Sequence, residues 1–167
     1  MAKETTRKKS SKKAATKTGV STPPKPRSNA WAARDKKTAA SLENLAQGVV
    51  KSALSGREPK FDVPTRAASN TKWNKSRGIL QMGPSTNTRQ LFNLGQARKF
   101  MQTLLHTQGI GDLIGQGKTS SLRGMFYAGL HTIQGTKEKT FDDQTESDAV
   151  LEDLEVTLGA LREELHV

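Results

Sequence analysis

Arg123 and Tyr127 lie four residues apart in the segment Arg-Gly-Met-Phe-Tyr, and Tyr127 is the only tyrosine of the chain. On a helix, a spacing of four places both side chains on one face. A phenol with its ordinary pKa near 10 is ionised in about one molecule in a thousand at neutral pH, and a nearby cation favours that reactive form. The pair therefore suits a tyrosine nucleophile for a DNA phosphodiester. A half-buried tyrosine beside a solvated arginine would have the same spacing.

The charge of the chain favours a polyanionic partner. The 167 residues carry a formal net charge of +11 with a pI near 10.1. Residues 1–125 contain 24 Lys and Arg against 6 Asp and Glu, whereas residues 126–167 contain 3 against 10. Such an excess of charge gives information about partners and solubility but not about the fold. The sequence thus predicts a polyanionic partner and a chain with two regions of opposite net charge.

Several classes of protein are excluded or disfavoured. The chain has no cysteine, which excludes disulfides, thiolate metal sites and cysteine nucleophiles. No apolar run reaches the length of a membrane span, and the first residues lack the apolar core of an export signal. We therefore expect an intracellular protein without a membrane partner, in the nucleoid or cytoplasm or in a nucleus.

Residues 1–38 form a Lys-rich segment that the composition predicts to be a disordered tail. It holds Lys, Ser, Thr, Ala and Pro with few large apolar residues, too few to offset the entropy of ordering. Its basic side chains could bind phosphates by counterion release without reading sequence. A solubilising tail or a nuclear-import patch is the alternative.

Residues 39–56 predict one amphipathic helix, from Ser41 as the N-cap to Ser55, with Gly56 as its terminator. The apolar stripe of this helix, the candidate docking surface, includes Leu42, Leu45, Val49 and Val50. A stripe of this kind is either packed on its own domain or presented to a partner.

Residues 57–92 lack a helical period and contain three prolines, which predicts an extended arm. Short β-favouring pieces at 60–63 and 79–82 indicate one hairpin. Beyond the arm, the apolar spacing predicts a helix over 93–107 that stops at Gly109, with Arg98 and Lys99 on its outer side.

The next segment is rich in glycine and is expected to be a flexible connection to a second helix, which Thr119, Ser120 or Ser121 would cap. Two helices joined in this way suggest a helix-turn-helix, with the second helix facing DNA. Its amino end suits a phosphate, because backbone amides and the helix dipole add to Lys118 and Arg123.

A last helix is predicted over 147–158, with Glu152, Asp153 and Glu155 in solvent and Gly159 as its end. No metal site is predicted. The carboxylates at 142–148 are explained by the start of that helix, and the three histidines lack the spacing of zinc ligands.

Four motifs together resemble the A subunit of DNA topoisomerase VI, a family that includes the protein making meiotic double-strand breaks. The motifs are Lys118-Thr119-Ser120-Ser121-Leu122-Arg123-Gly124-Met125-Phe126-Tyr127, Phe141-Asp142-Asp143-Gln144, Glu152-Asp153-Leu154-Glu155 and Leu158-Gly159-Ala160-Leu161-Arg162-Glu163-Glu164-Leu165. Weaker matches extend the resemblance over 41–167, so that only the basic tail lies outside it.

The resemblance implies a fold that is mainly α with small β elements, in which 93–167 form a winged-helix, CAP-like domain. It implies that Tyr127 becomes linked to a 5′ DNA end and that Arg123 supports the attack. Six further residues are candidates for contacts to DNA. These are Lys118, Thr119, Ser120, Ser121, Arg98 and Lys99.

The same resemblance implies a homodimer of A subunits and a B subunit that binds ATP and docks on the amino-terminal helix. In the family, Mg²⁺ is held by a Toprim domain that follows the winged helix. Because the sequence ends at Val167, before such a domain, we expect no autonomous cleavage by this chain. Two alternatives are a break-forming relative that does not reseal DNA and a non-catalytic DNA-binding module that acts architecturally.

Overall fold

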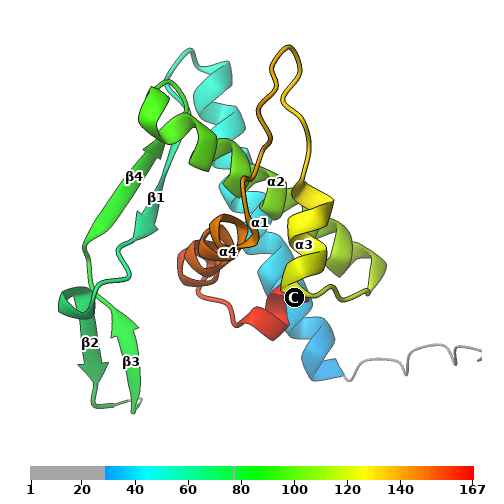
Figure 1. Cartoon of the computed structure of the whole chain (residues 1–167). Coiled ribbons are helices and arrows are strands. Elements are labelled where there is room, and N and C mark those ends of the chain that lie inside the picture. The colour runs from blue at the N-terminus through cyan, green and yellow to red at the C-terminus, as the bar shows by residue number, and fades with distance from the viewer. Residues whose placement is uncertain (1–28, 77) are drawn as a thin grey trace, which may run out of the picture.

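A computed structural model describes residues 29–76 and 78–167, which form a mainly helical structure with two small sheets (Figure 1). The predicted fold class, mainly α with small β elements, is confirmed at this level. In chain order the elements are α1 (Asn29–Leu54), β1 (Lys60–Pro64), η1 (Ala68–Asn70), β2 (Thr71–Asn74), β3 (Ile79–Met82), β4 (Thr86–Gln90), α2 (Leu94–Gln116), α3 (Leu122–Gly129), α4 (Gln144–Leu158) and η2 (Arg162–Leu165).

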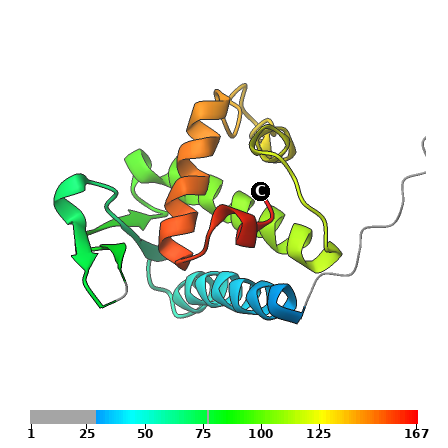
Figure 2. The ribbon, with the colours of Figure 1, turned by 90° about the horizontal axis from the view of Figure 1, so that it is seen from below.

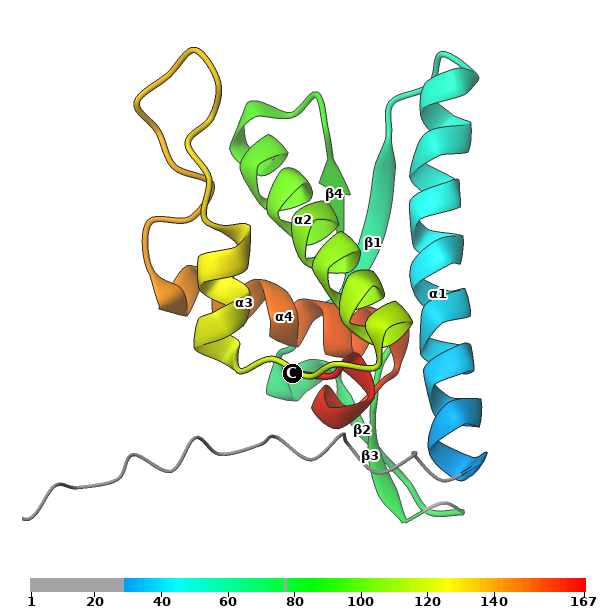
Figure 3. The same ribbon diagram turned by 90° about the vertical axis from the view of Figure 1, so that its right-hand side faces the viewer.

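Helix α1 is longer than predicted, because it is already helical at Asn29. Ser41 does not cap it: the Ser41 hydroxyl donates to the Lys37 carbonyl within the helix, at 3.2 Å. The early turns are held by tertiary contacts, since Thr38 is buried and α1 packs against α2, β1 and η2 (Figure 3). The predicted tail boundary at residue 38 is therefore wrong for 29–38, and residues 1–28 lie outside the described residues. Gly56, with φ of 68°, follows the helix as predicted.

The arm is one long antiparallel ribbon in two parts. β1 pairs with β4, from Lys60 opposite Gln90 to Pro64 opposite Thr86, and β2 pairs with β3 further along the same hairpin. The strands predicted at 60–63 and 79–82 are confirmed, whereas β2 and β4 were not predicted. Both are rich in polar residues, and a strand without apolar alternation gives little signal in sequence.

Helix α2 begins after its N-cap Asn93 and runs past Gly109 to Gln116. The predicted stop at Gly109 and the predicted flexible connection after it are therefore wrong. Gly109 instead allows α3 to approach closely, because a Cβ there would lie 3.2 Å from the Met125 methyl carbon. The helix ends at Gly117, which is left-handed with φ of 62°, and residues 117–121 form the short link to α3.

Helix α4 closes the core. It starts after Asp143, whose carboxylate accepts from the Glu146 amide at 2.8 Å, and not at Ser147 as predicted. Ser147 is buried inside the structure. The central buried cluster joins α1, α2, α3, α4 and η2 through Leu42, Ile110, Met125, Leu151, Leu154 and Leu165.

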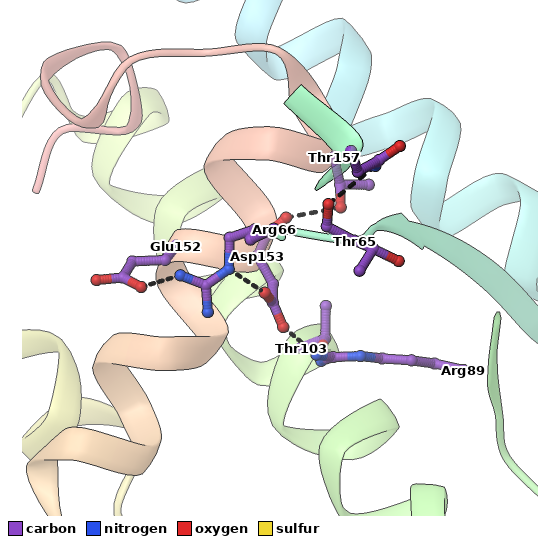
Figure 4. A network of polar contacts seen from close by, with 8 residues as sticks. Thr65, Arg66, Arg89, Thr103, Glu152, Asp153 and Thr157 are labelled. Atoms are coloured by element: carbon purple, nitrogen blue, oxygen red, sulfur yellow. Dashed lines mark hydrogen bonds and ion pairs between the residues drawn. The ribbon is translucent and has the colours of Figure 1, made fainter. Parts of the chain in front are cut away.

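Asp153 of α4 holds the ribbon to the helical body (Figure 4). Its carboxylate accepts from Arg66, just after β1, and from Arg89 on β4. Arg89 also donates to the Thr103 hydroxyl of α2 at 2.8 Å, and Arg66 reaches Glu152 as well. The prediction that Glu152, Asp153 and Glu155 are simply solvated is wrong, since Glu155 also pairs with an arginine, Arg162.

His106 of α2 is buried beneath α3. Its Nε2 lies 2.9 Å from the Ser147 hydroxyl, and its ring stacks on Phe141 with centroids 4.9 Å apart. Burial lowers the pKa of His106 to about 4, because desolvation disfavours the charged ring. The neutral ring thus forms part of the floor on which α3 rests.

Replacing Asp153 with Asn is expected to lower the free energy of unfolding by about 3 kcal/mol, because Arg89 would be left buried without its carboxylate partner. Glu152→Gln is the matched control, since the side chain is 43% exposed and such pairs contribute less than about 1 kcal/mol. Urea unfolding of the three proteins measures the difference. Equal losses in the two variants would contradict the role of Asp153.

His106 should make stability depend on pH. The folded pKa of about 4 lies below the ordinary 6.5, so the unfolded chain takes up a proton first. Stability should therefore fall as the pH drops from about 6.5 to about 4, by up to about 3 kcal/mol from this group. His106→Gln, which retains a partner for Ser147, should lack this component. The prediction would be contradicted if the free energies of unfolding of the two proteins changed by the same amount across that pH range.

Candidate nucleophile and nucleic-acid interface on α3

Helix α3 presents Arg123 and Tyr127 together on its outer face. The Arg123 Nη2 donates to the Tyr127 hydroxyl at 3.3 Å, and the guanidinium carbon lies 5.7 Å from the centre of the phenol ring. Tyr127 is 56% exposed. The predicted pairing on one helical face is confirmed, and the exposed hydroxyl is accessible to a large substrate.

The contact keeps a positive charge at the phenol oxygen. The hydrogen bond to Tyr127 raises the pKa of Arg123 above its ordinary value, so the guanidinium stays charged at any physiological pH. Arginine has five N–H donors and uses one here, which leaves others for the oxygens of a phosphate. The arrangement can therefore bind a phosphodiester next to the hydroxyl that would attack it.

Ser121 caps α3, and it is one of the three N-cap candidates predicted from the sequence. Its hydroxyl accepts from the Gly124 amide at 3.1 Å. Gly124 leaves room for Ser120, because a Cβ at position 124 would lie 2.4 Å from the Ser120 hydroxyl. Lys118 and Thr119 are exposed beside this end of the helix. The segment 118–121 and Arg123 thus form one polar surface at the amino end of α3.

His166, near the end of the sequence, fixes that segment in place. Its Nδ1 donates to the Lys118 carbonyl at 2.7 Å, and its own carbonyl accepts from the Ser120 amide at 2.9 Å. The other ring nitrogen lies 3.0 Å from the Asp35 carboxylate of α1. The sequence predicts neither a metal-binding role nor a structural role for His166. Its partners lie 48 and 131 positions away, and no local pattern reveals such a contact.

Aromatic rings support the carboxyl end of α3. Phe126 lies between Tyr127 and Phe141, with ring centres 5.2 and 6.4 Å away, respectively. Gly129 allows the Phe141 ring to approach, because a Cβ there would lie 2.9 Å from its edge. Tyr127 therefore projects from a helix whose inner side is fixed by packing, which limits the positions of its hydroxyl.

Arg98 and Lys99 do not join this surface. They lie near the other end of α2, about 27 Å along the helix axis from the link to α3. Arg98 is paired with Asp142 at 2.8 Å and with Glu146 at 3.3 Å. The prediction that Arg98 points outward is wrong, because the segment leading into α4 folds back over it. Lys99 is exposed and lines one hollow with Asp143 and Glu146.

The stripe predicted for docking is divided by the fold. Leu42 is buried in the core, and Leu45 packs against it. Val49 and Val50 instead line an apolar groove of about 440 Å³ between the carboxyl end of α1 and α2. Val50 is 54% exposed and Leu54 84%. The stripe thus packs on its own domain at one end and is open to a partner at the other.

The described residues do not suit a metal ion. Within 29–76 and 78–167 there is no group of three His, Asp or Glu side chains that could hold one. Of the carboxylates before α4, Asp142 pairs with Arg98 and Asp143 caps the helix. The Mg²⁺ that the family resemblance implies therefore has no donor set in this part of the chain. None of the described helices is long and apolar enough to cross a membrane.

Comparison with known proteins gives one consistent family. Residues 98–167, which include Tyr127, match the family model described as Type IIB DNA topoisomerase. The chain is 46% identical over 126 residues to the A subunit of type 2 DNA topoisomerase 6 from Pyrococcus horikoshii, covering 75% of this chain and 33% of the relative. The protein of the same name from Aeropyrum pernix is 38% identical over 124 residues, covering 70% and 32%.

A third relative of the same name, from Methanothermobacter thermautotrophicus, is 36% identical over 124 residues, covering 74% of this chain and 34% of the relative. The chain spans about a third of the length of the curated relatives it matches. The matched residues include most of α2 and all of α3 and α4, the elements that form and support the Arg123–Tyr127 surface. The chain therefore belongs to the family of DNA topoisomerase VI A subunits.

Proposed function

We propose that this chain supplies the DNA-cleaving tyrosine of a type IIB topoisomerase A subunit. The observation that carries the proposal is the contact of Arg123 with the exposed hydroxyl of Tyr127, within the residues that match the family model. Because Tyr127 is the only tyrosine, no other residue of the chain can form a phosphotyrosyl link. The proposed substrate is duplex DNA, cleaved transiently on both strands.

The proposed step is a displacement at phosphorus. The Tyr127 oxygen loses its proton and bonds to the phosphorus, while the bond from phosphorus to the 3′ oxygen breaks and that oxygen takes up a proton. The product is a 5′-phosphotyrosyl link and a free 3′ hydroxyl. Arg123 would stabilise charge on the non-bridging oxygens. Since the link stores the cleaved bond, the reverse reaction reseals the strand.

Duplex DNA would meet α3 through a winged-helix arrangement. The helices α2 and α3, joined by 117–121, would form the helix-turn-helix, and the loop 131–140 would form a small wing. Two observations support the wing: Thr132 and Lys139 form an isolated antiparallel bridge, and the Thr140 amide donates to the His131 carbonyl at 2.8 Å. Lys118 through Ser121 would then contact phosphates beside the scissile bond.

The complete enzyme would require partners. We propose that an ATP-binding B subunit docks on the apolar groove of α1 and α2, and that two A subunits together cleave the two strands. The groove suits an apolar helix, because Val50 and Leu54 remain exposed beside it. Docking would thus use the carboxyl half of α1, since Leu42 is occupied by the core.

Replacing Tyr127 with Phe should abolish covalent attachment of DNA to the protein while leaving DNA affinity unchanged. The protein is recovered from its own cells under denaturing conditions, treated with nuclease and examined by mass spectrometry for nucleotide on tyrosine. Arg123→Ala should lower the yield of adduct about 100-fold, as loss of one donor to a transition-state oxyanion does.

The double variant Phe126→Tyr/Tyr127→Phe is the matched control, because it keeps one tyrosine but moves the hydroxyl to the packed side of α3. It should form no adduct. An adduct that persists in Tyr127→Phe would contradict the proposal. If the wild-type protein forms none and binds DNA as the variant does, the chain is the non-catalytic DNA-binding module.

The double substitution Val50→Asp/Leu54→Asp should weaken binding to the B subunit from the same cells at least about 10-fold, because charge cannot enter an apolar contact without a desolvation cost. Both side chains are exposed, so the fold should be unaffected. Leu161→Asp, also at an exposed leucine but next to η2, should bind normally. Titration calorimetry measures the three affinities, and an unchanged affinity in the double variant would contradict docking at this groove.

A further inference from the structure

The outer part of the ribbon, the β2–β3 hairpin, extends away from the helical body. It lies across α4 from α3 and the Tyr127 surface (Figure 2). Trp73 and Leu80 face each other across the two strands in direct register. Both are exposed, at 58% and 68%. A large aromatic and a leucine displayed as a pair on a projecting hairpin indicate a contact surface rather than part of a core.

The hairpin also carries positive charge that no carboxylate among the described residues compensates. The sequence has no acidic residue from Val63 to Gly111. At the inner end of the ribbon, Arg66 and Arg89 are neutralised by the carboxylates of α4. At the outer end, Lys72 and Lys75 are exposed and make no ion pair with the residues that the structure describes. The charges of Lys72 and Lys75 on the outer hairpin are therefore available to a partner, whereas those of the two arginines are paired.

The joint between the two parts of the ribbon is rigid. The buried Asn70 side chain donates to the Thr65 and Ser85 carbonyls, each at 2.9 Å, and accepts from the Ser85 amide at 3.0 Å. Gly83 lies against it, since a Cβ there would be 2.5 Å from the Asn70 side-chain oxygen. The direction of the outer hairpin is thus set before any partner binds, which reduces the entropic cost of binding.

We propose that the β2–β3 hairpin is a separate binding site for duplex DNA. A two-stranded β-ribbon fits the major groove, and apolar side chains at such sites pack against bases or sugars. Lys72 and Trp73 are consecutive and point to opposite faces of the ribbon. One face would bring a cation to the phosphates while the other brings the Trp73–Leu80 pair to the groove.

Charge decides between DNA and a protein partner. An apolar protein surface would suit Trp73 and Leu80 but would leave Lys72 and Lys75 without a role. A polyanion uses all four side chains and also accounts for the lack of acidic residues between Val63 and Gly111. The site does not depend on the proposed chemistry of Tyr127, because it lies on another side of the molecule.

The test measures the affinity of the full chain for a 30-base-pair duplex across a range of salt concentrations, by fluorescence anisotropy. Lys72→Gln/Lys75→Gln should bind more weakly and reduce the slope of log affinity against log salt by about 1.8, for two lost phosphate contacts. Lys51→Gln/Arg57→Gln removes the same charge from exposed positions at and just after the carboxyl end of α1 and should leave the slope unchanged. Circular dichroism confirms that each variant is folded.

Trp73→Ala should lower the affinity several-fold without changing the salt slope, because its contact is not ionic. In the Trp31→Phe protein, Trp73 is the sole tryptophan, and its fluorescence should change on titration with the duplex. Unchanged slope, affinity and fluorescence would overturn the proposal and leave the Trp73–Leu80 pair to a protein partner. Loss of adducts in Tyr127→Phe is a separate readout, so the two proposals can fail independently.

Discussion

The carboxylate of Asp153 is the point through which the two halves of this structure are connected. It joins α4 to arginines at both sides of the ribbon, and Arg89 extends the connection to Thr103 of α2. A two-stranded ribbon is only marginally stable alone, so its direction depends on such an anchor. Because the same helix also packs against α3, one side chain relates the ribbon to the surface that carries Tyr127.

The position of α3 depends in turn on residues that are distant in sequence. His166 holds the link before α3, and Phe141 with His106 forms the floor beneath its carboxyl end. The helix has only eight residues, too few to be stable from its own hydrogen bonds. Tertiary contacts therefore decide where the Tyr127 hydroxyl lies, while Ser121 and two glycines provide the local geometry that permits those contacts.

The local part of this arrangement could be predicted, and the distant part could not. The spacing of Arg123 and Tyr127 fixes their common face, and serine and glycine preferences mark the start of α3 and the end of α4. The early turns of α1 carry no clear apolar stripe, and a glycine inside a helix looks like a stop unless the packing partner is known. Gly109 is such a case, since its partner Met125 lies on another helix.

The distribution of charge, too, could be predicted only in part from the sequence. The excess of basic residues in 1–125 and of acidic residues in 126–167 suggests two electrically different regions. In the folded chain, α4 and the segment before it bring carboxylates onto Arg66, Arg89 and Arg98, so part of that contrast is cancelled by ion pairing. The lysines and arginines left without carboxylate partners matter more for a polyanion than the net charge does. Lys118 and Arg123 beside Tyr127 form one such group, and Lys72 and Lys75 on the outer hairpin form another, so the proposed binding of DNA would depend on the fold as well as on composition.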